Sequence, residues 1–240
     1  MRIAILKSAR LSRETQQRVG DLDQVMIRLL AQPGQQWESF DVENGEFPAD
    51  PWIFNGFVIT GSPASVYDDA PWIAQLLELT RGIHARNIPL LGICFGAQVV
   101  AQALGGLVEP NPEGWDLGIV EVRANGHPLP KIQVPSPLRI LQSHRDIVVK
   151  LPPGAVNHAT SQRTPHEIFT LGEKILCLQG HPEMDNEIVR EIIEKRLAKG
   201  LLEPQRAHEG LASLTSQPHR DFLEDWLRDF FRAGGLGAVA

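Results

Sequence analysis

One of the two cysteines in the sequence lies in a pattern typical of an enzymatic nucleophile. The apolar run Pro89–Ile93 leads into the turn 92–96, with Cys94 at its centre, and a helical pattern follows at once. A strand, a Gly-x-Cys-x-Gly turn and a helix form a nucleophile elbow, here with sulfur in place of oxygen. The helix N-terminus favours the thiolate of Cys94, and the backbone N–H of Phe95 is free to stabilise an oxyanion. The pattern predicts that Cys94 is a nucleophile.

A thiol nucleophile needs a base, and the base needs a group that orients it. His181 and Glu183 follow the apolar run Ile175–Leu178, which places them just beyond the end of another strand. In a parallel sheet the carboxyl ends of the strands meet at one edge, where the Cys94 turn also emerges. The His-x-Glu spacing lets the carboxylate reach the imidazole from the same loop. We therefore predict that Cys94, His181 and Glu183 form a catalytic triad.

Short apolar runs alternate with helical patterns along most of the chain. Helical spacing of apolar residues predicts helices over 19–30 and 72–83. Strands alternating with helices of this length are typical of a mainly parallel sheet covered by helices on both faces. We therefore expect a three-layer, flavodoxin-like α/β fold. The predicted strands are Ile3–Leu6, Phe57–Thr60, Pro89–Ile93 and Ile175–Gln179.

The stretch Val108–Thr170 departs from this alternation. It is rich in proline and glycine and contains short alternating pieces such as Leu117–Val122 and Ile147–Lys150. Such a pattern is typical of strands joined by turns. We expect a small antiparallel excursion of hairpins and loops before the last strand of the core.

The C-terminal part of the chain is predicted to be helical. Apolar residues from Ile188 to Leu197 mark a helix that ends near Gly200, and a connection containing proline and serine follows. A final helix carries an apolar and aromatic stripe over 222–231, which is typical of a helix packed on a core. We expect residues 1–200 to form the main domain and residues 201–240 a helical extension packed on it.

Charge and cysteine content exclude several classes of protein. The formal net charge of −6 argues against the broad basic face that binding to nucleic acid or an anionic membrane requires. No run approaches the roughly 18 apolar residues of a membrane span. Cys94 and Cys177 form no disulfide framework or Cys-x-x-Cys motif. We expect a reduced, cytoplasmic protein.

Several motifs resemble those of class I, triad-type glutamine amidotransferases. The stretches 92–98 (Gly-Ile-Cys-Phe-Gly-Ala-Gln) and 180–183 (Gly-His-Pro-Glu) resemble the two signature motifs of that family. The segment 60–71 resembles its oxyanion loop, especially that of the glutaminase domain of GMP synthases. Residues 143–146 (Ser-His-Arg-Asp) resemble its substrate loop.

The resemblance implies a role for each matching position. Cys94 would be the nucleophile, His181 the general base and acid, and Glu183 the residue that orients His181. The remaining implied positions hold the oxyanion through backbone N–H groups or bind the γ-glutamyl substrate. They are Gly61 and Phe95 for the oxyanion hole, and Gln98, Ser143 and His144 for the substrate.

Two positions differ from the usual family pattern. Gly180 stands where the family usually has an aromatic residue, and Ser62 replaces the second glycine of a Gly-Gly-Pro segment. Both substitutions resemble the stand-alone γ-glutamyl peptidase-like branch of the family. A glycine at 180 removes a bulky side chain beside His181. We therefore expect it to open space for a leaving group larger than ammonia.

Three functions remain open at this point. The chain contains no Gly-x-x-x-x-Gly-Lys-[Ser/Thr] loop, so no nucleotide cofactor is expected, and its other histidines lack the spacing of a metal site. The first function is hydrolysis of glutamine or another γ-glutamyl compound, without a partner. The second is a glutaminase subunit that supplies ammonia to a separate synthetase. The third is a binding module without activity, which would not require all three triad residues.

Overall fold

A parallel five-stranded sheet forms one half of the molecule in the computed structural model, which describes residues 1–127, 135 and 137–236. All of these short strands except the edge strand consist mainly of apolar residues and are almost completely buried, as expected for a sheet covered on both faces. The strands are, in sheet order, β2 (Gln36–Asp41), β1 (Arg2–Lys7), β3 (Gly56–Ile59), β4 (Leu90–Ile93) and β11 (Ile175–Leu178).

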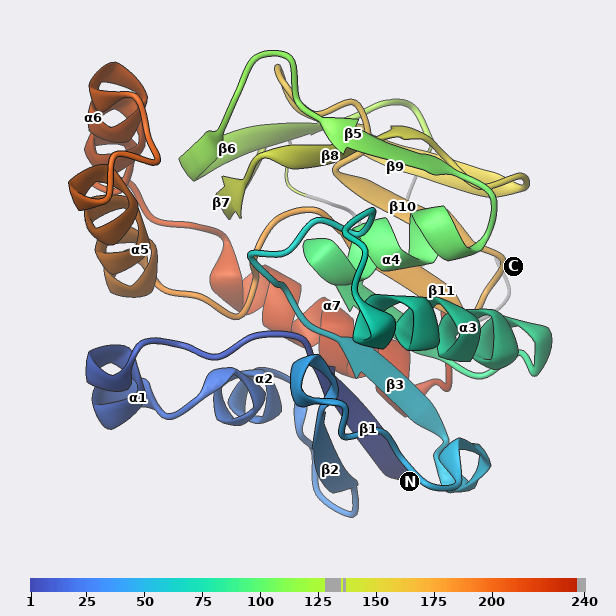
Figure 1. Cartoon of the computed structure of the whole chain (residues 1–240). Helices are drawn as coiled ribbons and strands as arrows, with labels where there is room; N and C mark the ends of the chain where they lie inside the picture. Colours follow the sequence, from blue (N-terminus) through green and yellow to red (C-terminus); the bar gives the residue numbers. More distant parts are fainter. Residues whose placement is uncertain (128–134, 136, 237–240) are drawn as a thin grey trace.

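Antiparallel strands extend the same sheet beyond β11. Two further strands form a separate antiparallel pair, which lies above the parallel strands β1 and β3 in Figure 1. The extension contains β10 (Ile168–Leu171), β9 (Ala155–Thr160), β6 (Asp116–Ala124) and β7 (Leu138–His144), and the separate pair is β5 (Leu107–Pro110) with β8 (Asp146–Lys150).

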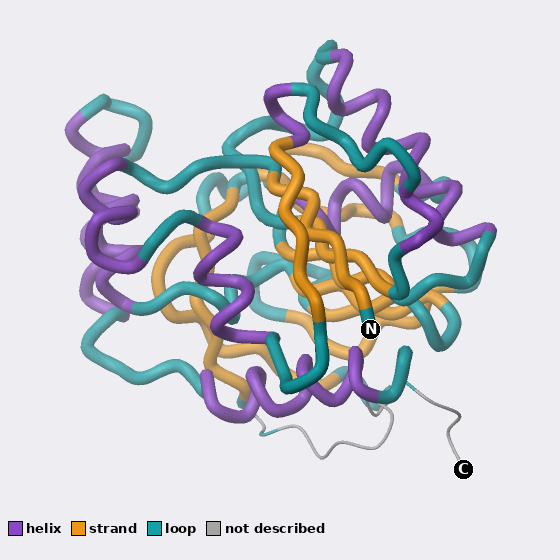
Figure 2. The backbone as a smooth tube through the Cα atoms, turned by 90° about the horizontal axis from the view of Figure 1, so that it is seen from below, coloured by secondary structure: helices purple, strands orange, loops and turns teal. Residues whose placement is uncertain are grey.

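Helices cover both faces of the parallel strands (Figures 1 and 2). On one face, α2 (Leu22–Leu30) and α7 (Arg220–Arg232) pack on β1, β4 and β11. On the other face, α3 (Pro71–Ala85) and α4 (Phe95–Ala103) pack on the opposite side chains of the same strands. Because successive side chains of a strand point to opposite faces, each strand contributes to both cores. The three layers therefore share one sheet.

A third hydrophobic core lies beside the antiparallel extension. It joins α5 (Asn186–Ala198) and α6 (Pro204–Ser213) to strands β6 and β7. Figure 1 shows α5 and α6 stacked at one side of the molecule, with α1 (Arg13–Val19) below α5. Arg18 of α1 forms ion pairs with Asp185 and Glu191, so the N-terminal helix is tied to α5.

These observations confirm the expected three-layer fold with an antiparallel excursion. Within that excursion, residues 128–134 and 136 lie outside the described part of the chain. The helix expected over 19–30 begins only at Leu22, because Asp21 accepts the hydrogen bonds that cap its start. The prediction of a connection between Gly200 and the final helix was wrong in part, since this segment contains helix α6.

Strand β2 is absent from the sequence-based prediction. Its residues, Gln-Trp-Glu-Ser-Phe-Asp, lack an apolar run, and only Asp41 among them is fully buried. As the edge strand it needs only one neighbour, and it pairs with β1 along its whole length. Tertiary pairing, and not local pattern, therefore forms this strand.

Gly118 in β6 provides a test of how closely α6 packs on the sheet. A Cβ atom at this position would overlap the carbonyl oxygen of Gly210 and the Oγ of Ser213, and its φ of 80° is also unfavourable for alanine. Gly114 has a similar φ of 82° with open space around it. We predict that Gly118→Ala lowers the free energy of unfolding by about 1–3 kcal/mol more than Gly114→Ala does. Chemical denaturation of both variants measures this difference, and equal losses would contradict the close packing.

Candidate active site

Neighbouring parallel strands bring the predicted nucleophile and base together. Cys94 directly follows β4, and His181 follows β11, which pairs with β4 in parallel. The backbone N–H of Cys94 donates a hydrogen bond of 2.8 Å to the carbonyl oxygen of Leu178, the last residue of β11. Gly61 follows β3, the neighbour of β4 on the other side. All three residues therefore lie at the carboxyl edge of the sheet.

The turn at Cys94 has the strained backbone of a nucleophile elbow. Cys94 has φ 52° and ψ −104°, in a region that non-glycine residues rarely occupy. A Cβ atom at Gly92 would lie 2.7 Å from the carbonyl oxygen of Gly96, and one at Gly96 would overlap the carbonyl oxygen of Ile59. Glycine is therefore needed at both flanking positions, as the sequence pattern implied.

His181 and Glu183 form a buried pair beside the thiol. The Nδ1 of His181 lies 2.8 Å from Oε1 of Glu183, and the two side chains are 4% and 0% exposed. The backbone N–H of His181 donates to the carbonyl oxygen of Leu141 in β7, at 2.8 Å, which fixes the loop. With Nδ1 facing the carboxylate, Nε2 is the nitrogen left to act on Cys94 or on a substrate.

The charges of this group keep His181 protonated. Burial lowers the pKa of His181, but the negative charges of Glu183 and Cys94, with hydrogen bonds to both, outweigh it and raise the pKa to about 10. The imidazolium therefore persists across neutral pH. Because this pKa exceeds the ordinary value of about 6.5, the pair stabilises the fold fully below pH 6.5. That contribution is lost as the pH rises through about 10.

The predicted oxyanion-hole residues lie on both sides of the thiol. A Cβ atom at Gly61 would lie 2.9 Å from the Cε1 of His181 and 3.7 Å from the Cβ of Cys94, so the backbone at 61 contacts both. Phe95 is the first residue of α4, where backbone N–H groups have no partner within the helix. Its buried ring packs against Trp72 at a centroid distance of 5.6 Å. These N–H groups are candidates for holding an oxyanion.

The predicted substrate-binding residues line one cavity beside Cys94. This cavity, of about 190 Å³, is bordered by Gln98, Ser143 and His144. Gln98 donates a 2.8 Å hydrogen bond to the carbonyl oxygen of Asp146, and Nδ1 of His144 lies 3.1 Å from the same oxygen. Burial, with the positive charges of His181 and Arg196, lowers the pKa of His144 to about 3, so this imidazole is neutral. The structure thus brings all three residues to the site.

Three further residues at the site were not predicted from the sequence. Gln179 directs its side-chain amide to the sulfur of Cys94, at 3.7 Å. Arg196, in the last turn of α5, donates a 2.8 Å hydrogen bond to the Oγ of Ser143. Its guanidinium carbon lies 4.3 Å from the centroid of the Trp115 ring. Gln179 was visible in the sequence next to the histidine motif, whereas nothing in the local pattern singled out Arg196 or Trp115.

The expectation that Gly180 opens space beside His181 is wrong. A Cβ atom at this position would lie 2.7 Å from Cδ1 of Ile140 and 3.0 Å from Nε2 of Gln142. Both residues belong to β7, which packs directly against the histidine loop. Glycine at 180 therefore permits close packing of two segments, and the space it vacates is filled.

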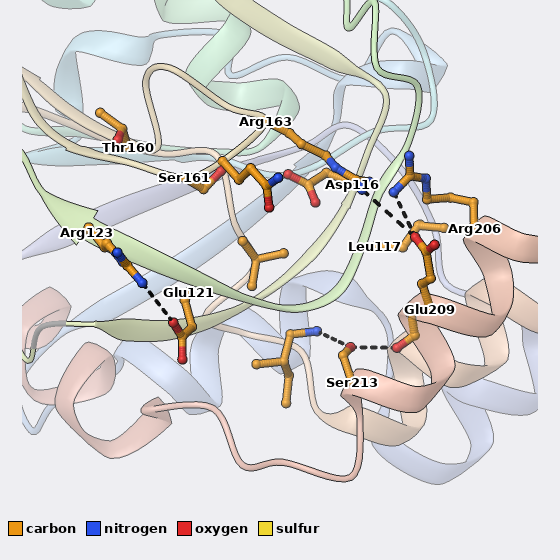
Figure 3. Close-up of a pocket in the computed structure, with 14 residues that line it drawn as sticks. Asp116, Leu117, Glu121, Arg123, Thr160, Ser161, Arg163, Arg206, Glu209 and Ser213 are labelled. Atoms are coloured by element: carbon orange, nitrogen blue, oxygen red, sulfur yellow. Dashed lines mark hydrogen bonds and ion pairs between the residues drawn. The ribbon is translucent and has the colours of Figure 1, made fainter.

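Two cavities meet at Cys94, and larger ones lie elsewhere. The second cavity at the thiol has about 180 Å³ and is bordered by residues 9–12, His181 and α5. One of the larger cavities, of about 600 Å³, lies between β6 and α6 and shares no lining residue with the two at Cys94. Figure 3 shows Arg163 and Arg206 directed at Glu209 there, with Arg206 3.0 Å from its carboxylate. Its lining contains no thiol or imidazole among the described residues, so we assign the chemistry to Cys94.

A metal site and a membrane-spanning helix are both absent from the described part of the chain. Its histidine, cysteine and carboxylate side chains form no group of three or more that could hold a metal ion. No helix there is long and apolar enough to cross a membrane.

Comparison with known proteins gives a consistent result. The model of the family "Glutamine amidotransferase class-I" matches residues 24–199. Gamma-glutamyl peptidase 3 of Arabidopsis thaliana is 32% identical over 218 residues, covering 87% of each chain. The GMP synthase of Bacillus pumilus is 34% identical over 130 residues, which cover 54% of this chain and 24% of that protein. A glutamine amidotransferase structure from Thermotoga maritima has a TM-score of 0.76 at 22% identity, covering 99% of both chains. The chain therefore belongs to the class I glutamine amidotransferase family.

Proposed function

We propose that the protein is a cysteine hydrolase that cleaves the γ-glutamyl amide bond of glutamine or a related γ-glutamyl compound. The observation that supports this most is the buried contact of His181 with Glu183 beside the strained Cys94 turn. Family membership and the γ-glutamyl peptidase relative favour the same bond type. In this proposal Cys94 is the nucleophile, His181 the general acid and base, and Glu183 the orienting residue.

The geometry supports a two-step reaction. The Cys94 thiolate attacks the γ-carbonyl carbon, and the N–H groups of Gly61 and Phe95 stabilise the negative oxygen that forms. His181 then gives its proton to the departing amine, and the C–N bond breaks to leave a γ-glutamyl thioester. Next, His181 takes a proton from water, the resulting hydroxide attacks the thioester, and glutamate leaves. The thiolate and the protonated His181 are then restored.

A second candidate function is a glutaminase subunit that passes ammonia to a separate ATP-dependent synthetase. The match to a segment of a GMP synthase favours it, since the matched part covers only 24% of that protein. A non-catalytic binding module is less well supported, because binding alone does not require a thiol, an imidazole and a carboxylate in contact.

We also propose a cellular setting and a domain division. Both cysteines are free and buried, which suits a protein of the reducing cytoplasm. Residues 1–200 would form the catalytic domain, with 201–240 as its extension, of which 237–240 lie outside the described residues. The extension is supported by the packing of α7 on the sheet.

The first prediction is that the purified chain acts without partner or ATP. Incubation with glutamine and with γ-glutamyl dipeptides should release glutamate, since all proposed groups for the reaction belong to this chain. Free glutamate is measured with and without ATP, and both conditions should give the same rate. No release from the pure protein, restored by addition of a cell extract, would favour the synthetase-subunit function instead.

The second prediction distinguishes the two thiols. Cys94→Ala should lower kcat by on the order of 10⁶, as expected for loss of a nucleophile. Burial raises the pKa of the Cys177 thiol, so that thiol is unreactive and Cys177→Ala should keep nearly full activity. Mass spectrometry of the trapped thioester should place the γ-glutamyl group on the peptide that contains Cys94. Modification of Cys177 would refute the assignment.

The third prediction concerns the carboxylate that orients His181. Replacing Glu183 by glutamine removes the negative charge that opposes the effect of burial, so the pKa of His181 should fall by about 1–3 units. NMR titration of the His181 ring in the two proteins measures this shift. Glu183→Gln should also retain more activity than His181→Ala, because an orienting residue contributes less than the proton-transfer group. An unchanged pKa would mean that another group provides the charge.

A further inference from the structure

Arg196 lies where the two cavities at Cys94 meet. It borders the cavity that contains Gln98 and His144, and it also borders the one formed by residues 9–12 and α5. An acyl-transfer thiol needs room for the acyl group on one side and for the amine on the other. A side chain that reaches both spaces can contact either part of a substrate.

Two contacts hold the guanidinium of Arg196 in place. One N–H group donates to the Oγ of Ser143 at 2.8 Å, and the guanidinium lies over the ring of Trp115 at 4.3 Å. A guanidinium has five N–H donors in a rigid fork, and the remaining ones have no acceptor in the described part of the chain. Arg196 is therefore positioned in advance with donors to spare.

The other cations at these cavities are neutralised or solvated. The Nε of Arg10 donates to Asp41 at 2.8 Å, and Lys195 lies 2.9 Å from Glu14. Arg145 is exposed to solvent. Arg196 is half-buried, and no described carboxylate lies within ion-pair distance of it. The negative charge of Cys94 favours the charged guanidinium, but a half-buried cation without a carboxylate partner is costly, and the arrangement favours an anion that arrives with a ligand.

We propose that Arg196 is a specificity-determining residue that binds a carboxylate of the substrate through its free N–H fork. The inference rests on the proposed γ-glutamyl hydrolysis and adds to it a required substrate group. A γ-glutamyl substrate offers two carboxylates that the guanidinium can bind: the α-carboxylate of the γ-glutamyl part, and a carboxylate on the departing amine. Arginine suits either, because its planar fork matches both carboxylate oxygens.

Two pairs of substrates show which of these two carboxylates Arg196 binds. The first pair is γ-glutamyl ethylamide and its α-carboxamide form, which differ only at the α-carboxylate. The second pair is γ-glutamylglycine and γ-glutamylglycinamide, which differ only on the leaving amine. In the unmodified protein, kcat/KM should favour the carboxylate form of one pair by on the order of 10- to 100-fold, as expected for a charged hydrogen bond.

Arg196→Met should lower that preference to near unity while keeping an unbranched side chain in the same place. Arg196→Lys should give an intermediate ratio, since it keeps the charge and loses the fork. Arg190→Met is the matched control, because Arg190 is an exposed arginine on the same helix and borders neither cavity. The control should keep the preference of the unmodified protein.

Two outcomes would overturn the proposal. If Arg196→Met leaves the kcat/KM preference of both substrate pairs intact, no carboxylate is bound by Arg196. Equal slowing on all four substrates would show that the charge acts on Cys94 and not on a substrate. If the unmodified protein cleaves none of the four, the proposed function fails instead. Calorimetric Kd values for the same compounds on Cys94→Ala, with and without Arg196→Met, then decide the carboxylate contact.

Discussion

The parallel pairing of β4 with β11 determines the geometry on which the site depends. The register places Ile93 opposite Leu178, so the thiol and the imidazole follow directly from paired positions. The hydrogen bond from the N–H of Cys94 to Leu178 continues this ladder into the elbow itself. Both strands are buried on both faces, which makes their relative position rigid. The distance between nucleophile and base is thus a property of the core of the protein.

Small residues make that geometry possible. Glycines at 61, 92 and 96 each lie where a side chain would strike the backbone or the ring of His181. The same rule applies at Gly180, where β7 packs against the histidine loop. Strain at Cys94, of roughly 1–3 kcal/mol for such a backbone, persists because the surrounding contacts leave the turn no alternative. Stability elsewhere in the sheet therefore maintains an unfavourable conformation at the thiol.

The sequence identified the parts of the fold that have a strong local pattern. The buried strands, the elbow and the long amphipathic helices were predicted because their periodicity is visible within a few residues. The edge strand β2 and helix α6 were missed, since partners distant in the sequence form them. Arg196 is about 80 residues from Trp115 and about 50 from Ser143 along the chain, so only the folded structure reveals their contact. Gly180 was misread because local sequence does not show which strand fills a vacated space.

Helix α5 begins only a few residues after Glu183 and carries Arg196 in its last turn. It rests on α6, β6 and β7 through a core of its own, separate from the two cores that hold the parallel strands. In the proposed site, the thiol and the substrate-selecting group thus belong to different packing units. Substitutions within the third core can shift the guanidinium while the thiol stays fixed. Such a division lets substrate preference diverge between relatives through hydrophobic repacking, without any change in the reacting groups themselves.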